Sequence, residues 1–251
     1  MIKRISIVSL IFSFIICMTA FATAEEHHDI IKENFLSVTG NEPEENSFLG
    51  VVSRTKYIDR WGILINYEKE TLNDHLIDTS RIAHILVLIK NIKFGTELNA
   101  DRAVTLAMYH DVPEIITDDM PTPIKYINPE MKKIYTQVEN QATKSLLNLI
   151  EPDLRSEFSS ILESNNNPED IELRKIVKYA DTISAYIKCL REKSMGNKDF
   201  DKARKNLHKK LLQIDSPEVK YFIENFLPSF DNTDNKQECE EPKESPEQSI
   251  F

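Results

Sequence analysis

The chain has 251 residues, of which 41% are apolar and 8% aromatic, and its formal net charge at pH 7 is -10. This composition excludes a chain that is disordered throughout and leaves room for one domain with a hydrophobic core. The net charge excludes binding of a nucleic acid polymer through a diffuse positive field. The five glycines form neither a G-x-G-x-x-G nor a G-x-x-x-x-G-K-[ST] phosphate loop.

The first 24 residues have the pattern of a secretory signal peptide. Lys3 and Arg4 precede an apolar run over residues 5–21, which ends in Ala-Thr-Ala before Glu25. We therefore expect an exported protein, periplasmic or secreted, with no stable membrane partner once the signal is cleaved. Because the run is close to the lower length limit of a membrane span, an uncleaved anchor is one alternative. A misassigned start codon, which would leave the protein in the cytoplasm, is the other.

Polar segments flank the central region. Residues 25–46 are acidic and predict a linker, and residues 231–251 carry seven acids and few apolar side chains, which predicts a disordered tail. Most of the negative charge falls in these two segments, so residues 47–230 are nearly neutral. Cys189 lies in an apolar helical stretch and is expected to be a core residue.

Residues 47–230 predict helices almost throughout. Apolar residues from 48 to 58 predict a first helix that ends at Trp61, and Thr71 with Asp74 predicts a capping box that begins a second. Asn99 predicts the cap of a third helix. A Pro-rich loop follows at 121–123, and the later helices are expected at 129–150, 152–164, 168–194, 199–213 and 216–226. No segment alternates for long as a strand would, so the predicted fold class is all-α, a single helical bundle.

Polar residues interrupt apolar helical faces at several places. His110 and Asp111 end a strongly apolar run, and two adjacent residues, which point about 100° apart on a helix, can reach one ion only near a helix end. Glu114 lies one turn further on. Asp181 lies at the edge of an apolar stripe, where an ion pair with Lys188 or Arg191 is the preferred interpretation of this residue alone. His75 alone is better explained as a core or capping histidine.

The interpretation changes when these residues are considered as a set. His75, the His110-Asp111 pair and Asp181 lie on three different predicted helices and supply two nitrogen and two carboxylate ligands. Such a mixed set suits a divalent ion such as Mn²⁺, Co²⁺, Fe²⁺ or Mg²⁺, with open positions for water and a phosphate oxygen.

The order His, His-Asp, Asp on a helical chain resembles the HD-domain phosphohydrolase superfamily. Four stretches are similar to the YfbR-like group of bacterial 5'-deoxynucleotidases: I-D-R-W at 58–61, A-M-Y-H-D at 107–111, D-M-P-T-P-I-K-Y at 119–126 and A-D-T-I-S-A-Y-I-K-C-L at 180–190. The similarity spans roughly residues 47–230. Two positions depart from the family pattern, since Asp74 replaces a Glu and Leu76 a Ser, and both adjoin a ligand without removing one.

The resemblance implies a role for each of these residues. His75, His110, Asp111 and Asp181 would hold the divalent metal ion, and Glu114 and Asp119 would be the catalytic carboxylates. Arg60 and Trp61 would favour deoxyribose over ribose. The residues expected to contact the nucleotide are Arg60, Trp61, His75, Asp111, Asp119, Met120, Pro121 and Thr122.

The function that the resemblance implies is hydrolysis of deoxyribonucleoside 5'-monophosphates to deoxynucleoside and phosphate, with Co²⁺, Mn²⁺ or a similar ion. Two alternatives stay open. One is an HD hydrolase of another phosphate ester, such as a nucleoside triphosphate or an alarmone. The other is a catalytically idle nucleotide-binding or scaffold protein. The presence of the expected catalytic carboxylates Glu114 and Asp119 argues against this second alternative. A homodimer is a further hypothesis. Lys125, after the Pro-rich loop, is expected to be a solvated lysine, and assistance in phosphate binding is the alternative.

Overall fold

The structure, a computed structural model, describes residues 46–125, 127–163 and 168–231. The predicted signal peptide, the linker up to residue 45 and the tail beyond residue 231 lie outside the described residues and stay predictions. The described residues form helices, turns, loops and one isolated bridge between Asp59 and Thr71. The all-α prediction is therefore confirmed. Within these residues no helix combines the length and apolarity needed to cross a membrane.

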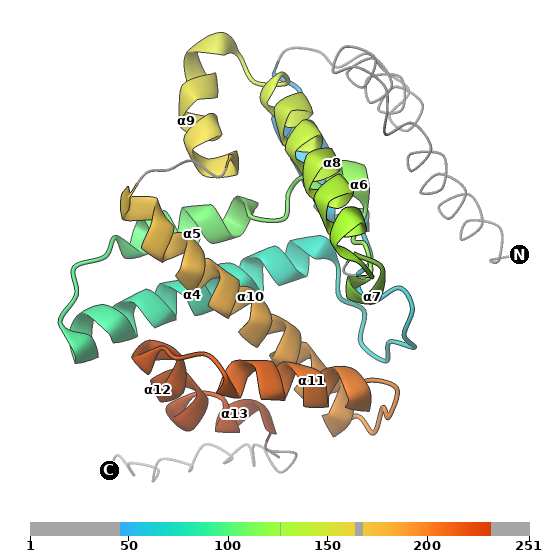
Figure 1. The fold of residues 1–251 in the computed structure, drawn as a ribbon, viewed down its shortest axis with the longest axis vertical. Coiled ribbons are helices and arrows are strands. Elements are labelled where there is room, and N and C mark those ends of the chain that lie inside the picture. Colours follow the sequence, from blue (N-terminus) through green and yellow to red (C-terminus); the bar gives the residue numbers. More distant parts are fainter. Residues whose placement is uncertain (1–45, 126, 164–167, 232–251) are drawn as a thin grey trace, which may run out of the picture.

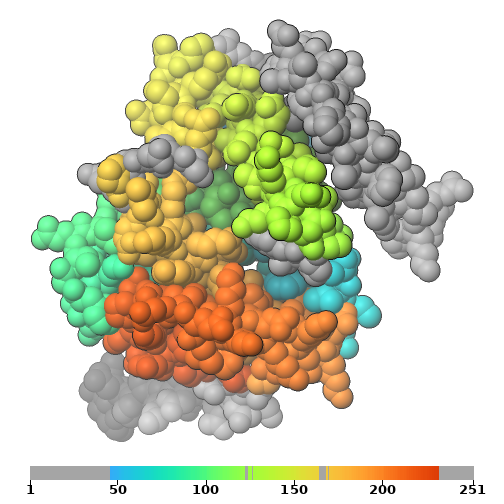
Figure 2. Space-filling view, viewed as in Figure 1, coloured from blue at the N-terminus to red at the C-terminus, as the bar shows by residue number. Residues whose placement is uncertain are grey.

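Two long helices, α4 and α10, cross at the centre of the molecule, and α5 lies against both (Figure 1). The C-terminal helices α11, α12 and α13 lie together along one edge, and α8 and α9 stand at the opposite end, as the space-filling view also shows (Figure 2). In chain order the elements are α3 (Phe48–Val52), the 3-10 helix η1 (Ser53–Tyr57), α4 (Leu72–Phe94), α5 (Ala100–Tyr109), α6 (Glu114–Thr117), α7 (Thr122–Lys125), α8 (Pro129–Leu147), α9 (Pro152–Leu162), α10 (Pro168–Ser194), α11 (Asp201–Leu212), α12 (Pro217–Asn225) and α13 (Pro228–Asp231).

The predicted caps begin the helices that carry the site. The Thr71 hydroxyl accepts a hydrogen bond from the Asp74 amide at 3.2 Å, and the Asp74 carboxylate accepts one from the Thr71 amide at 2.9 Å, which completes the capping box of α4. The helix ends at Gly95, whose φ of 72° is readily adopted only by glycine. Asn99 caps α5 as predicted, through a bond from the Arg102 amide at 2.9 Å.

Two segments differ from the predictions. The predicted helix over residues 48–58 divides into the five-residue α3 and a 3-10 turn, and only Phe48, Val51 and Thr55 within it are buried. Because helices in proteins are stabilised mainly by the burial of one face, three buried residues are too few to stabilise a helix over the whole of residues 48–58. The Pro-rich segment is predicted as a loop but contains the short helix α7. Proline is compatible with the first turn of a helix, because the backbone N–H that it lacks would have no intrahelical partner there. Predicted helix ends elsewhere differ by up to three residues.

The hydrophobic core has two parts. The larger one joins α4, α5, α10 and α12 through residues such as Leu86, Leu106 and Ile183, and the smaller one joins α3, the start of α4 and the end of α8. Cys189 is fully buried, as predicted, and burial raises the pKa of its thiol to about 12. The first turn of α4 belongs to the smaller part of the core, and the middle of α10 belongs to the larger part. The polar residues of these two helices therefore meet at the boundary between the two parts.

Candidate metal and catalytic site

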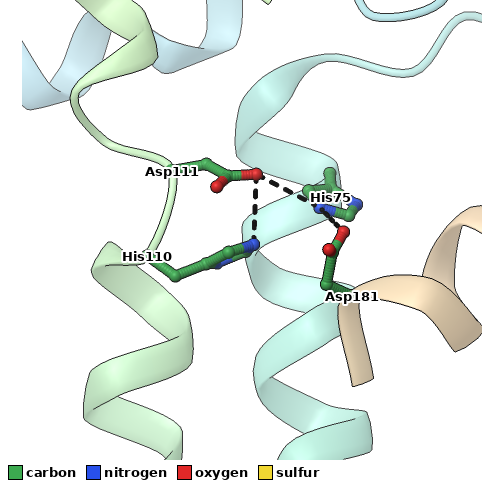
Figure 3. Close-up of side chains that lie close together, drawn as sticks. All are labelled: His75, His110, Asp111 and Asp181. Carbon is green, nitrogen blue, oxygen red and sulfur yellow. Dashed lines mark ion pairs between the residues drawn. The ribbon is translucent and has the colours of Figure 1, made fainter. Parts of the chain in front are cut away.

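Four of the predicted site residues converge from three helices (Figure 3). His75 comes from the first turn of α4, His110 caps the end of α5 with Asp111 next to it, and Asp181 comes from the middle of α10. One potential ligand atom from each of the four lies within 4.8 Å of all the others. The structure thus brings together residues that are 106 positions apart in the chain, between 75 and 181.

The closest approaches within the cluster join imidazole nitrogens to carboxylate oxygens. His75 Nε2 lies 3.3 Å from Asp181 Oδ1 and 3.7 Å from Asp111 Oδ2, and His110 Nε2 lies 3.1 Å from the same Asp111 oxygen. His110 and Asp111 point to one place because α5 ends at Tyr109, and the turn that follows releases Asp111 from helical geometry.

Each imidazole is held by the ring nitrogen that faces away from the cluster. His110 Nδ1 lies 2.7 Å from the carbonyl oxygen of Ala107, which can only accept, so Nδ1 carries the proton and donates. His75 Nδ1 lies 3.3 Å from the Ser184 hydroxyl. Both Nε2 atoms therefore face the carboxylates, which is the arrangement of metal-binding histidines.

The charges in the cluster suit a cation. Burial by itself would raise the pKa of Asp111, but the neighbouring His110 charge holds that pKa well below its usual range. The pKa of Asp181 is likewise lowered against the effect of burial, by His75 and Lys178. The Nε2 atom of His110 is buried and lacks a well-aligned hydrogen bond. Two ionised carboxylates and two imidazole nitrogens, one of them unsatisfied, fit a divalent metal ion.

An ion pair of Asp181 is present, but the prediction of Lys188 or Arg191 as its partner is wrong. Asp181 pairs with Lys178 at 2.7 Å, whereas Lys188 pairs with Glu192 and Arg191 lies 3.3 Å from Asp78. Lys178 is one helical turn before Asp181 and thus on the same side of α10. Lys188 and Arg191 follow Asp181 at a distance of two or more turns.

Arg60 extends the cluster towards the acids of α6 and the loop after it. Its side chain is only 10% exposed, and its Nη1 lies 4.0 Å from Asp111, 3.8 Å from Glu114 and 3.7 Å from Asp119. Although burial opposes this, the negative charges of these acids raise the pKa of Arg60. The structure thus places a permanent positive charge and two more predicted site residues beside the cluster, where a phosphate group would need them.

Glu114 is the buried acid of this group. It is the first residue of α6, and its Oε2 is buried without a hydrogen-bond partner. Burial, together with the charges of Asp111 and Asp119, raises the pKa of Glu114 well above its usual value. A raised pKa keeps a carboxyl protonated at higher pH, which is the property of a general acid.

Trp61 and the segment at 119–122 complete the set of predicted contacts. Trp61 has a φ of 62°, its ring lies 5.2 Å from that of Phe200, and its Nε1 donates to Glu70 Oε1 at 3.2 Å. Met120 and Pro121 are partly buried just before α7. Thr122 begins α7, and its side chain lies outside what the structure describes.

Two residues near the site differ from what the sequence suggests. Glu70, which is not among the predicted site residues, is buried and accepts hydrogen bonds from both Arg60 and Trp61. An acid in a polar segment carries no signal of such a role. Lys125 is not a solvated lysine, because it pairs with Glu139 at 2.7 Å and lies 4.2 Å from the centre of the Tyr135 ring.

The raised pKa of Glu114 predicts that Glu114→Gln stabilises the metal-free protein near neutral pH. The unfolded-state pKa of a Glu carboxyl is about 4.3, and above it the Glu114 carboxyl ionises more readily in the unfolded chain than in the native protein. The contribution of Glu114 to native stability therefore falls as pH rises from this value towards the folded-state pKa. Glutamine has no such penalty. Melting temperatures in a chelator should therefore agree below about pH 4 and diverge as pH rises, with Glu224→Gln, an exposed acid of α12, as the unaffected control. Divergence in the opposite sense would contradict the raised pKa.

Comparisons with known proteins agree on one family. The family model described as 5'-deoxynucleotidase YfbR-like matches residues 47–230. A 5'-deoxynucleotidase of Vibrio cholerae is 42% identical over 190 residues, 76% of this chain and 97% of the relative, and one of Yersinia pestis is 42% identical over 183 residues, 73% and 92% of the two chains.

Solved structures show the same fold at lower identity. An HD-domain phosphohydrolase from Listeria innocua aligns with a TM-score of 0.64 at 21% identity, over 73% of this chain and 88% of that one. The cyanophage S-2L HD phosphohydrolase DatZ, bound to dA and one catalytic Zn²⁺ ion, aligns with a TM-score of 0.51 at 19% identity, over 72% and 95%.

The chain shares its helical fold with the class of HD-domain phosphohydrolases. Within that class, the chain belongs to the YfbR-like 5'-deoxynucleotidase family.

Proposed function

We propose that this protein is a metal-dependent phosphomonoesterase that hydrolyses deoxyribonucleoside 5'-monophosphates to deoxynucleoside and phosphate. The observation that carries the proposal is the convergence of the His75, His110, Asp111 and Asp181 cluster with Arg60 and Glu114. A cation site, a guanidinium that can bind phosphate and a carboxyl group with a raised pKa together suit the hydrolysis of a phosphate monoester. The names of the relatives, 5'-deoxynucleotidase, support the same substrate class.

The two-histidine, two-aspartate cluster would hold the metal ion, for which we propose Co²⁺, Mn²⁺ or a similar ion. Its oxygen and nitrogen donors suit these ions, and the Zn²⁺ in DatZ is a further candidate. When bound, a divalent ion binds phosphoryl oxygens and lowers the pKa of a coordinated water towards about 7.

The protein's own groups then divide the remaining work. Arg60 would bind and orient the phosphate through Nη1, the guanidinium nitrogen that faces the three carboxylates. Glu114, whose pKa is raised by burial and by the charges of Asp111 and Asp119, would donate a proton to the leaving 5'-oxygen. Asp119, which lies 3.7 Å from the same Arg60 nitrogen, would accept the proton of the attacking water. Met120, Pro121 and Thr122 would line the nucleotide site next to it.

Trp61→Ala should lose the preference for deoxyribose before it loses turnover. A rigid indole can exclude a 2'-hydroxyl by contact, and removal of such a wall is expected to lower the ratio of kcat/KM for dAMP over AMP by about tenfold. Steady-state phosphate release from both nucleotides measures this ratio. Tyr57→Ala, an exposed aromatic on the same segment, is the control. Equal losses against both sugars would refute the assignment.

The function itself is tested by phosphate release from the purified protein with Mn²⁺ or Co²⁺. The panel contains deoxy- and ribonucleoside monophosphates, nucleoside triphosphates and an alarmone. We expect turnover of the deoxynucleoside monophosphates above all others. Preferred hydrolysis of a triphosphate or alarmone would favour the alternative HD hydrolase, and no release from any compound would favour an idle binding protein. A homodimer stays a prediction, as does export of the protein.

A further inference from the structure

One carboxylate oxygen joins Arg60 and Trp61, the two residues for which we propose contacts with the phosphate and the sugar. Glu70 Oε1 lies 3.2 Å from Arg60 Nε and 3.2 Å from Trp61 Nε1, and both nitrogens donate to it. The backbone carbonyl of Glu70 accepts a third bond, from the Arg60 amide at 2.9 Å. Glu70 is itself buried, so these bonds are shielded from water.

The bond to Arg60 determines which edge of the guanidinium faces the site. A guanidinium carries five donors in a flat fork and can present either edge to a carboxylate. Because Glu70 takes Nε, the Nη1 end is left to face Asp111, Glu114 and Asp119. Without Glu70, Asp111, Glu114 and Asp119 would still attract the positive charge of Arg60. None of the three acids determines which edge of the guanidinium faces them.

The bond to Trp61 holds an indole whose backbone is in an unfavourable region. Trp61 has a φ of 62°, which non-glycine residues rarely adopt and which persists only when the surroundings hold it. The surroundings here are the Glu70 carboxylate at the indole nitrogen and the Phe200 ring against the indole face. Glu70 therefore holds Arg60 and Trp61 in register with each other.

The rest of this segment is attached independently of the Glu70 side chain. The Ile65 amide donates to Asp199 at 2.8 Å, and the amides of Tyr67 and Glu68 donate to Glu192 at 3.1 Å each. Asn197 donates to the Ile65 carbonyl at 2.7 Å. Loss of the Glu70 carboxylate leaves these attachments in place, so its effect is expected at Arg60 and Trp61.

We propose that Glu70 is a positioning residue that establishes the deoxyribose preference of the site by holding Arg60 and Trp61 in place together. The proposal rests on the proposed function for its substrate. Among the described residues, the hydrogen bonds and ion pair of the Glu70 side chain go to Arg60 and Trp61 and not to the metal-ligand cluster, Glu114 or Asp119, so Glu70 acts through its two neighbours.

The kinetic test compares Glu70→Ala, Glu70→Gln and Glu68→Ala with Mn²⁺ present. The Ala variant should lower the dAMP to AMP ratio of kcat/KM by about tenfold, with a raised KM for both nucleotides as Arg60 loses its orientation. The Gln variant should keep most of the ratio, because its amide oxygen still accepts from both donors. Glu68 has an exposed side chain two residues away, so Glu68→Ala matches the loss of charge and should leave the ratio unchanged.

A second readout needs no activity, because Trp61 is the chain's single tryptophan. In the metal-free protein, acrylamide quenching of Trp61 fluorescence should rise in Glu70→Ala and return close to the wild-type level in Glu70→Gln. If the Ala variant does not fold, Glu70→Leu retains side-chain volume without an acceptor and is expected to behave as described for Ala.

The two readouts separate the possible failures. Equal loss of kcat/KM for both sugars in the Ala variant, or an unchanged sugar ratio, would overturn the specificity role. Unchanged quenching would overturn the positioning of Trp61. A wild-type protein that hydrolyses no deoxynucleotide would remove the proposed function and the sugar role together, and the quenching series would then still decide whether Glu70 positions Trp61.

Discussion

Asp111→Ala should lower phosphate release from a deoxynucleoside monophosphate by at least roughly a thousandfold. Asp111 Oδ2 faces both imidazoles, at 3.1 Å from His110 Nε2 and 3.7 Å from His75 Nε2, and it also lies 4.0 Å from Arg60. Its removal takes away one of the two carboxylate charges with which the cluster would bind a cation. Metal ions contribute several kcal/mol to such reactions, and each 1.36 kcal/mol is a factor of ten in rate.

The measurement combines turnover with binding of Mn²⁺ to the purified protein. We expect Asp111→Ala to weaken Mn²⁺ binding and to retain the circular dichroism spectrum of the wild type. Asp101→Ala is the matched control, because Asp101 is an exposed acid at the other end of the same helix, α5. Unchanged phosphate release by Asp111→Ala would show that the metal mechanism is wrong.

Glu192→Ala should destabilise the protein by about 3–5 kcal/mol, the usual effect of removing one partner of a buried ion pair. Glu192 and Lys188 are 0% and 1% exposed, and they pair with each other one turn apart near the end of α10. The Glu192 carboxylate also accepts from Asn197 at 2.6 Å and from the amides of Tyr67 and Glu68. Its loss leaves the Lys188 ammonium group, the Asn197 side-chain amide and two backbone amides with fewer partners.

Urea unfolding and thermal melting measure this effect. For a domain of this size, such a loss corresponds to a decrease in melting temperature of about 6–20 °C. Glu224→Ala, which removes an exposed acid of α12, should change stability little. The double variant Lys188→Met with Glu192→Leu should regain part of the stability, because it removes both charges but leaves the amides that donate to Glu192 without this acceptor. A loss below about 1 kcal/mol in the single variant would contradict the buried ion pair.

Helix positions and the His110-Asp111 pair could be predicted because their signals are local or chemically distinctive, whereas His75 and Asp181 were assigned to the site only as members of a set. Thr71 with Asp74, and Asn99, predict helix starts because a cap acts within three residues of itself. His110 and Asp111 stand out because an imidazole and a carboxylate at the end of an apolar helix need partners. The helix predicted over residues 48–58 failed because its length depended on burial by distant elements rather than on its own pattern.

The sequence by itself determined the all-α class, the caps and the residue types of the site, since these depend on periodicity, on caps a few residues long and on side-chain chemistry. Only the tertiary structure decided the partners: Lys178 for Asp181, Glu192 for Lys188, and Glu70 for Arg60 and Trp61. It also decided the raised pKa of Glu114. The physical reason is that burial and Coulomb interactions depend on distance in space, and in this fold α4, the end of α5 and α10 meet at one point.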